Sequence, residues 1–252
     1  MKDRQARPDL PLLLLALLAL GLVLAVVLVL IFRPGQSEEK IMLDKRALQD
    51  QVWVSYGDSI TDGGYWQAAV AEHFALNHID QGIGGTTLAG FGPLAFWQEG
   101  RLSEIVAAQP ALVTIMGGTN DFYSDFYLGT EEQFDLPLAD KTMDNFLGAY
   151  SYIVEYLQAA LPDTTIVLMT TPLNATYFSD QPLNGRGNSI MDFADATAQV
   201  ARHYGLLLVD MRELYQNAAD FDQDFWDGIH PNLQGAAKIS QALIESLSQI
   251  AK

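Results

Sequence analysis

Residues 52–61 read VWVSYGDSIT, and this stretch decides how the rest of the chain is interpreted. Its first five residues are mostly β-branched or aromatic, which predicts a short buried strand. The composition of residues 65–75 predicts a helix, so residues 57–58 fall where the strand ends and the helical segment begins. Ligands of open α/β sheets bind at this carboxyl edge of the strands. Ser59 is therefore presented at a corner that suits a nucleophile, because nearby backbone N–H groups can hold an oxyanion.

The same residues also fit a purely structural role. Asp and Ser are among the preferred N-cap residues, and a helix is predicted to follow them. Asp58 or Ser59 would then only satisfy the first N–H groups of that helix. This stretch alone leaves both interpretations open.

Strand-like and helix-like segments alternate along the rest of the chain. Further strands are predicted at residues 78–80, 111–116, 165–170 and 206–210, and further helices at 144–160, 188–204 and 233–250. This alternation predicts an α/β fold whose parallel sheet is covered by helices on both faces. The order of the strands within the sheet does not follow from the sequence.

Polar or small residues follow the predicted strands at the positions where a site would form. Gly85 lies in a glycine-rich turn, Asn120 follows the third strand, and Asp227 and His230 share the loop before the last helix. A carboxylate three residues before an imidazole can hold it as a general base for a serine. Taken singly, each residue also fits a turn, a helix cap or a satisfied loop histidine. Together they favour a site, because they supply a nucleophile, a base, its partner and hydrogen-bond donors.

Four segments in this order resemble the four motif blocks of the SGNH (GDSL-type) hydrolases. They are GDSIT at 57–61, Gly85, GTND at 118–121 and DGIH at 227–230, and the resemblance spans nearly all of residues 51–250. It implies a flavodoxin-like three-layer α/β/α sandwich with a five-stranded parallel sheet. It also implies a serine esterase that needs no cofactor and no metal.

The resemblance assigns a role to each matched position. It makes Ser59 the nucleophile, His230 the base and Asp227 the partner of the base. It places the N–H groups of Ser59 and Gly85 and the side chain of Asn120 in the oxyanion hole. The second block departs from the family, because residues 81–86 read QGIGGT and lack the usual Asn before the glycines. Gly84 is therefore the alternative to Gly85 as donor.

The expected reaction is hydrolysis of an ester through an acyl-enzyme, with an O-acetyl, other O-acyl or short-chain lipid ester as the substrate, free or on a polysaccharide. Two alternatives stay open. The acyl group could pass to a cell-surface sugar, since the same triad serves both acceptors, or the domain could be a catalytically idle surface binding module. The intact Ser59, Asp227 and His230 argue against the idle module.

The N-terminal part of the chain differs from the rest. Residues 10–32 carry no charge and would span about 34 Å as a helix at ~1.5 Å per residue, enough to cross a bilayer core. We expect an uncleaved membrane anchor rather than a signal peptide, because residues 29–32 lack the small residues of a cleavage site. The predicted organisation is thus a tail at 1–9, the anchor at 10–32, a linker at 33–50 and a hydrolase domain at 51–252. The flanking positive charges are nearly balanced, but a short tail before a long domain favours an extracytoplasmic catalytic domain.

Charge and cysteine content restrict the partners. Four of the 14 basic and two of the 31 acidic residues lie in positions 1–33, which leaves 10 and 29, a net charge of −19, for the rest. Such a surface argues against nucleic acid as a partner. The chain has no cysteine, which excludes disulfides and thiolate metal sites. The acidic segment 220–224 lacks the Gly and Glu that a calcium loop requires, so no metal is expected there.

Aromatic residues are frequent in the loops that carry the four motifs. The segment 122–127, which directly follows Asn120, is the best candidate to line an acyl or sugar pocket. Ordinary packing is the competing interpretation. The sequence makes no prediction of the oligomeric state.

Overall fold

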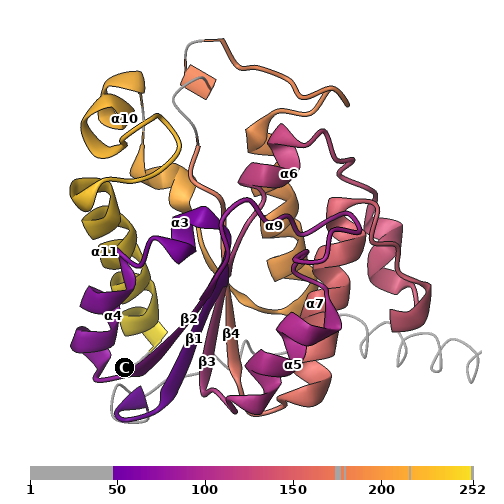
Figure 1. Cartoon of the computed structure of the whole chain (residues 1–252), viewed down its shortest axis with the longest axis horizontal. Coiled ribbons are helices and arrows are strands. Elements are labelled where there is room, and N and C mark those ends of the chain that lie inside the picture. Colours follow the sequence, from indigo (N-terminus) through magenta and orange to yellow (C-terminus); the bar gives the residue numbers. More distant parts are fainter. Residues whose placement is uncertain (1–47, 174–176, 179, 216, 251–252) are drawn as a thin grey trace, which may run out of the picture. The chain divides into compact units, whose positions relative to one another are not determined.

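Five parallel strands form one sheet in the order β2-β1-β3-β4-β5 in the computed structural model of the chain (Figure 1). This is the strand order of flavodoxin-like sheets, so the predicted class, strand number and direction are confirmed. The structure describes residues 48–173, 177–178, 180–215 and 217–250. The strands are β1 (Val52–Gly57), β2 (Asn77–Gly82), β3 (Leu112–Met116), β4 (Thr165–Met169) and β5 (Leu207–Val209).

Helices cover both faces of the sheet, as Figure 1 shows. One layer contains α4 (Gln67–Phe74) and α11 (Leu233–Ile250), and the other contains α5 (Glu99–Ala107), α7 (Phe146–Ala160) and α9 (Ile190–Tyr204). All four helices predicted from the sequence end within one residue of these bounds at their C-termini, and three of them begin two residues later than predicted. The helix predicted at 65–75 begins at Gln67 instead, because the chain turns at Trp66, which is its N-cap.

Successive residues of one strand pack into two separate hydrophobic clusters, because side chains alternate between the two faces of a sheet. On β1, Trp53 packs with the α4 and α11 layer, whereas Val54 and Tyr56 pack with the α5, α7 and α9 layer. All three side chains are fully buried. The near-continuous apolar runs seen in the sequence follow from this burial on both faces.

Local signals fix the ends of the long helices. Helix α9 starts with a capping box in which the Ser189 hydroxyl accepts the Asp192 N–H and the Asp192 carboxylate accepts the Ser189 N–H. It ends at Gly205, whose φ of +64° suits a glycine C-cap. Helix α7 is capped by the Asn145 side chain, which accepts the Gly148 N–H at 2.8 Å.

Several short elements were not predicted from the sequence. They are α3 (Ser59–Asp62), α5 (Glu99–Ala107), α6 (Thr119–Tyr123), α10 (Ala218–Asp224), η1 (Glu131–Asp135), η2 (Leu138–Asp140) and η3 (Met211–Leu214). Most are too short to show a hydrophobic period, and isolated helices of this length are marginal in water. Tertiary contacts therefore hold them in place.

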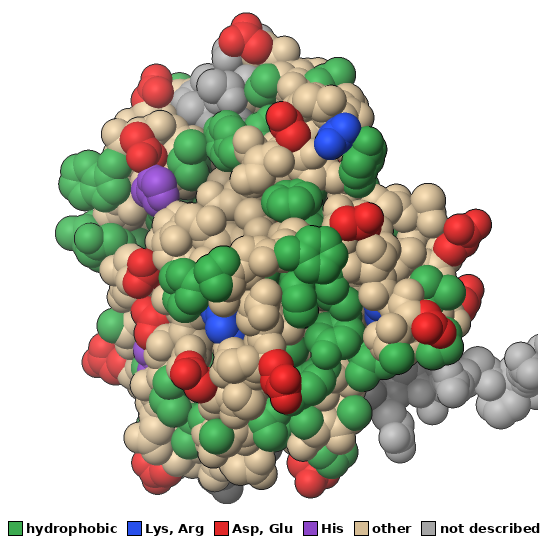
Figure 2. Space-filling view, turned by 45° about the vertical axis from the view of Figure 1, so that its right-hand side comes forward, with side chains coloured by type: hydrophobic (Ala, Val, Ile, Leu, Met, Phe, Trp, Pro, Cys, Tyr) green, Lys and Arg blue, Asp and Glu red, His purple; other side chains and the backbone are tan. Residues whose placement is uncertain are grey.

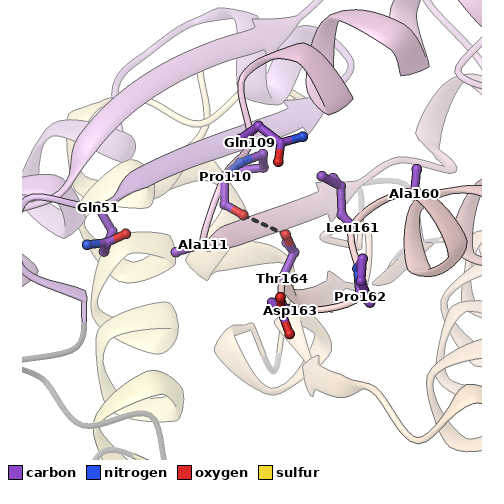
Figure 3. Close-up of a pocket in the computed structure, with 9 residues that line it drawn as sticks. All are labelled: Gln51, Gln109, Pro110, Ala111, Ala160, Leu161, Pro162, Asp163 and Thr164. Carbon is purple, nitrogen blue, oxygen red and sulfur yellow. Dashed lines mark hydrogen bonds between the residues drawn. The ribbon is translucent and has the colours of Figure 1, made fainter.

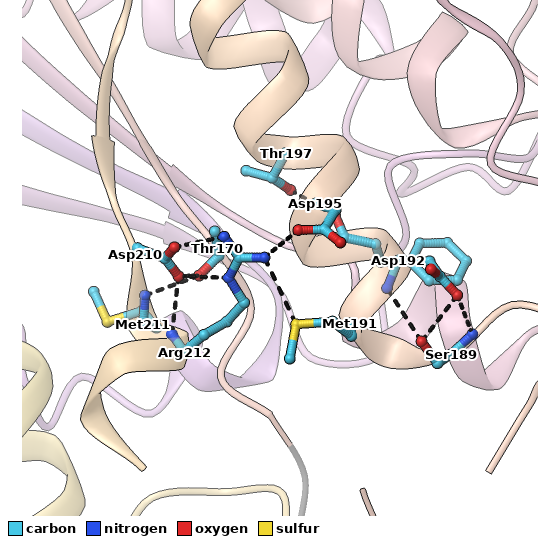
Figure 4. A network of polar contacts seen from close by, with 10 residues as sticks. Thr170, Ser189, Met191, Asp192, Asp195, Thr197, Asp210, Met211 and Arg212 are labelled. Carbon is cyan, nitrogen blue, oxygen red and sulfur yellow. Dashed lines mark hydrogen bonds and ion pairs between the residues drawn. The ribbon is translucent and has the colours of Figure 1, made fainter. Parts of the chain in front are cut away.

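A closed network of polar contacts secures the chain where it leaves β5 (Figure 4). The guanidinium of Arg212 donates to both carboxylate oxygens of Asp210, at 2.7 and 2.5 Å, and also pairs with Asp195 on α9. Burial opposes ionisation of Asp210, but the bonds from Arg212 hold its pKa below the ordinary value. Thr170, at the end of β4, donates to the same carboxylate and accepts the Met211 N–H. The network joins η3, the end of β4 and α9.

The predicted N-terminal anchor lies outside the described residues, as do the tail at 1–9 and most of the linker. Within residues 48–250, apart from the gaps given above, no helix is both long and apolar enough to cross a bilayer. The described residues belong to one compact unit.

Candidate active site

The turn from β1 into α3 presents the Ser59 side chain at the carboxyl edge of the sheet. A Cβ on Gly57 would lie 2.0 Å from Thr61 Oγ1 and 2.9 Å from the Met116 carbonyl oxygen, so this turn closes only around glycine. Asp58 is the N-cap of α3, and its Oδ1 accepts the Ile60 N–H at 3.0 Å. The capping interpretation thus holds for Asp58 and not for Ser59, whose hydroxyl is directed elsewhere.

The hydroxyl of Ser59 is hydrogen-bonded to the imidazole of His230. Its Oγ lies 2.9 Å from His230 Nε2, and His230 Nδ1 lies 2.7 Å from Asp227 Oδ2. Burial acts to raise the pKa of Asp227, but the backbone and ring N–H groups of His230 hold that pKa below its ordinary value. An ionised carboxylate can only accept, so His230 Nδ1 donates to it and Nε2 is free to take the serine proton.

The loop that carries Asp227 and His230 is fixed from several sides. Asp227 Oδ1 accepts the N–H groups of Ile229 and His230 at 3.0 and 2.8 Å. Phe225 and Pro231 form an antiparallel bridge across the loop. The carboxylate of Asp224, at the end of α10, is fully buried and pairs with Lys238 on α11. These contacts hold the imidazole in place although His230 itself is partly exposed.

The turn after β2 brings Gly84 beside Ser59, and Gly85 follows it in the chain. The Gly84 N–H donates to Asp62 Oδ2 at 3.1 Å, and a Cβ on Gly84 would lie 3.7 Å from the Ser59 Cβ. Gly85 has a φ of +76°, and a Cβ there would meet nothing within 4 Å. Among the described residues no hydrogen bond from the Gly85 N–H is found.

Asn120 lies on α6 and is joined to the same turn. Its Nδ2 donates to the Thr86 carbonyl oxygen at 2.9 Å, which leaves the second amide hydrogen for another acceptor. The next residue, Asp121, is fully buried and accepts the N–H groups of Leu88 and Ala89 at 3.0 and 2.8 Å. The motifs at 85 and 120 are therefore tied to each other. Figure 1 shows α3, α6 and α10 at the same end of the sheet.

Two buried carboxyl groups lie below the site. Burial raises the pKa of Asp58 to about 6 and that of Asp121 to about 7, and the two groups repel each other. Asp58 Oδ2 is buried, and no hydrogen-bond partner is found for it among the described residues. The sequence places Asp121 in the GTND block at 118–121 but predicts no separate role for it. Its position after Asn120 at the end of a buried strand was the one available signal.

The acidic segment 220–224 lies in α10, and among the described residues no group of three His, Asp or Glu side chains could hold a metal ion. A cavity of about 310 Å³ lies at the opposite, amino-terminal edge of the sheet, and Figure 3 shows the residues that line it. It is lined by Gln51, Gln109, Pro110, Ala111, Ala160, Leu161, Pro162, Asp163 and Thr164.

The aromatic segment predicted to line a pocket divides into two parts. Phe122 is only 4% exposed and packs in the core, which is the packing interpretation. Tyr123 and Tyr127 are exposed, and Arg186 lies 4.2 Å from the centre of the Tyr127 ring. Trp226, which directly precedes Asp227, is 72% exposed, more than any other aromatic side chain of the described residues.

Two curated relatives have esterase names. The chain is 28% identical over 207 residues to an acetylxylan esterase from Xylanibacter ruminicola, covering 76% of this chain and 42% of the relative. It thus spans less than half the length of that protein. It is 26% identical over 196 residues to a human isoamyl acetate-hydrolyzing esterase 1 homolog, covering 71% of this chain and 74% of the relative.

Solved structures share the fold. A protein from Lactobacillus plantarum superposes with a TM-score of 0.67 at 22% identity, covering 80% of this chain and 98% of the other. Residues 55–238 match the model of the GDSL-like Lipase/Acylhydrolase family. This range contains all the residues that carry the motif resemblance. The chain therefore belongs to the GDSL-like lipase/acylhydrolase family and, with it, to the ester hydrolases.

Proposed function

We propose that the chain is a serine esterase in which Ser59 is the nucleophile, His230 the general base and Asp227 the group that orients the base. The observation that carries this proposal is the continuous set of hydrogen bonds from Ser59 Oγ to His230 Nε2, at 2.9 Å, and from His230 Nδ1 to Asp227 Oδ2, at 2.7 Å. His230 takes the Ser59 proton as Oγ attacks the ester carbonyl carbon. It returns that proton to the leaving alcohol, and water then releases the acyl group by the same steps.

Three donors stabilise the tetrahedral intermediate in this proposal: the N–H groups of Ser59 and Gly85 and the side-chain amide of Asn120. Gly85 is preferred to Gly84 because the Gly84 N–H already donates to Asp62. Asn120 supports the role because its bond to the Thr86 carbonyl fixes the amide and leaves one N–H to donate. Each such donor is worth about 3–4 kcal/mol of transition-state stabilisation.

The substrate we propose is an acetyl or other short acyl ester of a neutral alcohol, including a sugar. Both curated relatives have names that refer to acetate esters. The side chains of His230 and Asp227 are 41% and 54% exposed, which leaves room for a bulky alcohol. Figure 2 shows one face on which acidic side chains are spread and basic ones are few. Such a surface disfavours anionic substrates and nucleic acid.

Transfer of the acyl group to a sugar hydroxyl remains the alternative outcome of the same acyl-enzyme. Water and a sugar hydroxyl compete for that intermediate, so the products decide between them. We also propose that residues 10–32 anchor the protein in a membrane with the catalytic domain extracytoplasmic. The uncharged sequence of that segment supports this, and extraction of membranes with alkaline carbonate tests it.

Hydrolysis of p-nitrophenyl esters from acetyl to palmitoyl by the full chain tests the function. We expect a preference for the short esters and a loss of at least about 10³-fold in kcat for Ser59→Ala. Ser103→Ala, an exposed serine on α5 far from the site in sequence, is the matched control. Equal activity of the wild type and Ser59→Ala would reject the serine mechanism. Preferential turnover of palmitoyl ester would reject the short-acyl proposal.

A further inference from the structure

The contact between α3 and the turn at residues 82–85 is closer than a sheet and its next helix require. A Cβ on Gly82 would lie 2.2 Å from the Asp62 backbone N and 2.6 Å from its Cα. The two backbones therefore touch, and only glycine permits it. On the other side of the turn, the Ile83 N–H donates to the Gly57 carbonyl at 3.0 Å. The turn is thus fixed against the segment that carries Ser59.

The side chain of Asp62 adds a second point of attachment. Its Oδ2 accepts the Gly84 N–H at 3.1 Å. Asp62 is the last residue of α3, whose first residue is Ser59, so one helical turn separates the two. The Asp62 carboxylate therefore links α3, which begins with Ser59, to the N–H of Gly84, the residue before Gly85.

This bond decides which glycine N–H is available to a substrate. The Gly84 N–H donates to Asp62, whereas the Gly85 N–H has no acceptor among the described residues. Gly85 adopts a φ of +76° with open space at its Cβ position. Beyond Gly85, the Thr86 hydroxyl donates to the Ile83 carbonyl at 2.7 Å, and the Thr86 carbonyl accepts the Asn120 amide. Asp62 thus lies at one end of a chain of contacts that reaches two of the three proposed oxyanion donors, Gly85 and Asn120.

We propose that Asp62 is a positioning residue for the oxyanion hole, which holds Gly84 so that the Gly85 N–H faces the carbonyl oxygen bound at Ser59. This inference rests on the proposed function. The carboxylate does not touch the substrate; it acts through the peptide between Gly84 and Gly85. Since a negative charge beside the site opposes a developing oxyanion, its hydrogen bond rather than its charge is what favours catalysis.

Two substitutions separate the hydrogen bond from the charge. Asp62→Ala removes both, whereas Asp62→Asn keeps an oxygen that can accept the Gly84 N–H. We expect Asp62→Ala to lower kcat for p-nitrophenyl acetate about 10- to 100-fold with KM changed less than about 2-fold, because a donor is misplaced and not removed. Asp62→Asn should keep kcat within about 3-fold of the wild type or raise it. Asp80→Ala, which removes a neighbouring exposed carboxylate that accepts the Gly82 N–H, is the matched control.

The inhibition constant of a tetrahedral inhibitor would not change if Asp62 only stabilised the fold, so it tests the positioning role. An alkylboronic acid that adds to Ser59 places an oxygen in the oxyanion hole, so its inhibition constant should rise for Asp62→Ala in proportion to the loss of kcat/KM. The urea midpoint of Asp62→Ala should stay close to that of the wild type, because Asp62 is exposed.

Three outcomes would overturn the proposal while leaving the serine esterase standing. In the first, Asp62→Ala has the kcat of the wild type although Ser59→Ala is inactive. In the second, Asp62→Asn and Asp62→Ala lose kcat equally. In the third, the inhibition constant of the boronic acid for Asp62→Ala equals that for the wild type. Full activity of Ser59→Ala would instead reject the proposed function itself.

Discussion

His230 Nε2 lies 2.9 Å from Ser59 Oγ, although the two residues are 171 positions apart in the sequence. The topology produces this distance. Ser59 follows strand β1, which lies between β2 and β3, and His230 precedes α11, which packs beside α4 on the same face of the sheet. The loop of His230 is further fixed by Lys238 and Asp224. The pair is therefore preformed by packing and needs no substrate to assemble it.

Asn120→Ala is expected to lower kcat about 10²–10³-fold with little change in KM, because the lost amide donates mainly in the transition state. Steady-state kinetics on a short ester measures this. Asn77→Ala is the control, since Asn77 also donates to a backbone carbonyl, at 2.7 Å, but lies where β2 begins. A rise in KM at unchanged kcat would show that Asn120 only binds the ground state.

The buried Asp121 is expected to make the protein less stable as pH rises. Its folded pKa of about 7 lies above the ordinary value of 3.8, so the folded state binds more protons between these values. The stabilisation is complete below the unfolded pKa and is lost as pH rises through the folded pKa. Asp58, with a pKa of about 6, acts in the same direction.

Urea unfolding at about pH 5 and about pH 8 checks this expectation. The wild-type midpoint should fall at the higher pH, and Asp121→Asn should reduce that fall. Asp163→Asn, a change at an exposed carboxylate, should leave the fall as it is in the wild type. An Asp121→Asn protein with the wild-type pH dependence would contradict the assignment.

Gly82→Ala is expected to cost about 3 kcal/mol of unfolding free energy, because the new methyl group would meet the Asp62 backbone and not a flexible side chain. Gly100→Ala is expected to have the opposite effect on the unfolding free energy. Gly100 lies in α5, a Cβ there meets nothing within 4 Å, and alanine should stabilise the helix by about 0.5 kcal/mol. Chemical denaturation of both variants measures the difference. A Gly82→Ala protein as stable as the wild type would contradict the close contact.

Lys238→Met is expected to destabilise the protein by about 2 kcal/mol, because it leaves the fully buried Asp224 carboxylate without its partner. The Lys238→Met/Asp224→Asn double variant should recover part of that loss, since no charge is then buried. Urea unfolding of the two variants provides the test. A loss below about 0.5 kcal/mol for Lys238→Met would place the pair among ordinary surface ion pairs.

The sequence predicted the sheet and the residues of the site for physical reasons that can be named. Strands buried on both faces, such as β3 and β4, appear as short apolar runs, and the polar residues that follow them stand out. Helix α11 was predicted with its observed ends because its amphipathic pattern is long. The strand order did not follow, because it depends on the directions of the crossover connections.

The contacts that support the site were not predicted. The segment 220–224 was considered only as a calcium loop, yet Asp224 pairs with Lys238, a partner that is visible only once α10 packs on α11. The bond between Asp62 and Gly84 likewise depends on where the end of β2 meets α3. The choice between Gly84 and Gly85 was open in the sequence for the same reason.

The most direct test of the serine mechanism is the site of covalent modification by an alkyl fluorophosphonate. Peptide mass spectrometry should locate the phosphonyl group on Ser59 in the wild type and find none in Ser59→Ala. In His230→Ala, the modification should slow by at least about 10²-fold, because the serine has lost its general base. Modification of a different residue, or of Ser59 at the same rate with and without His230, would contradict the account.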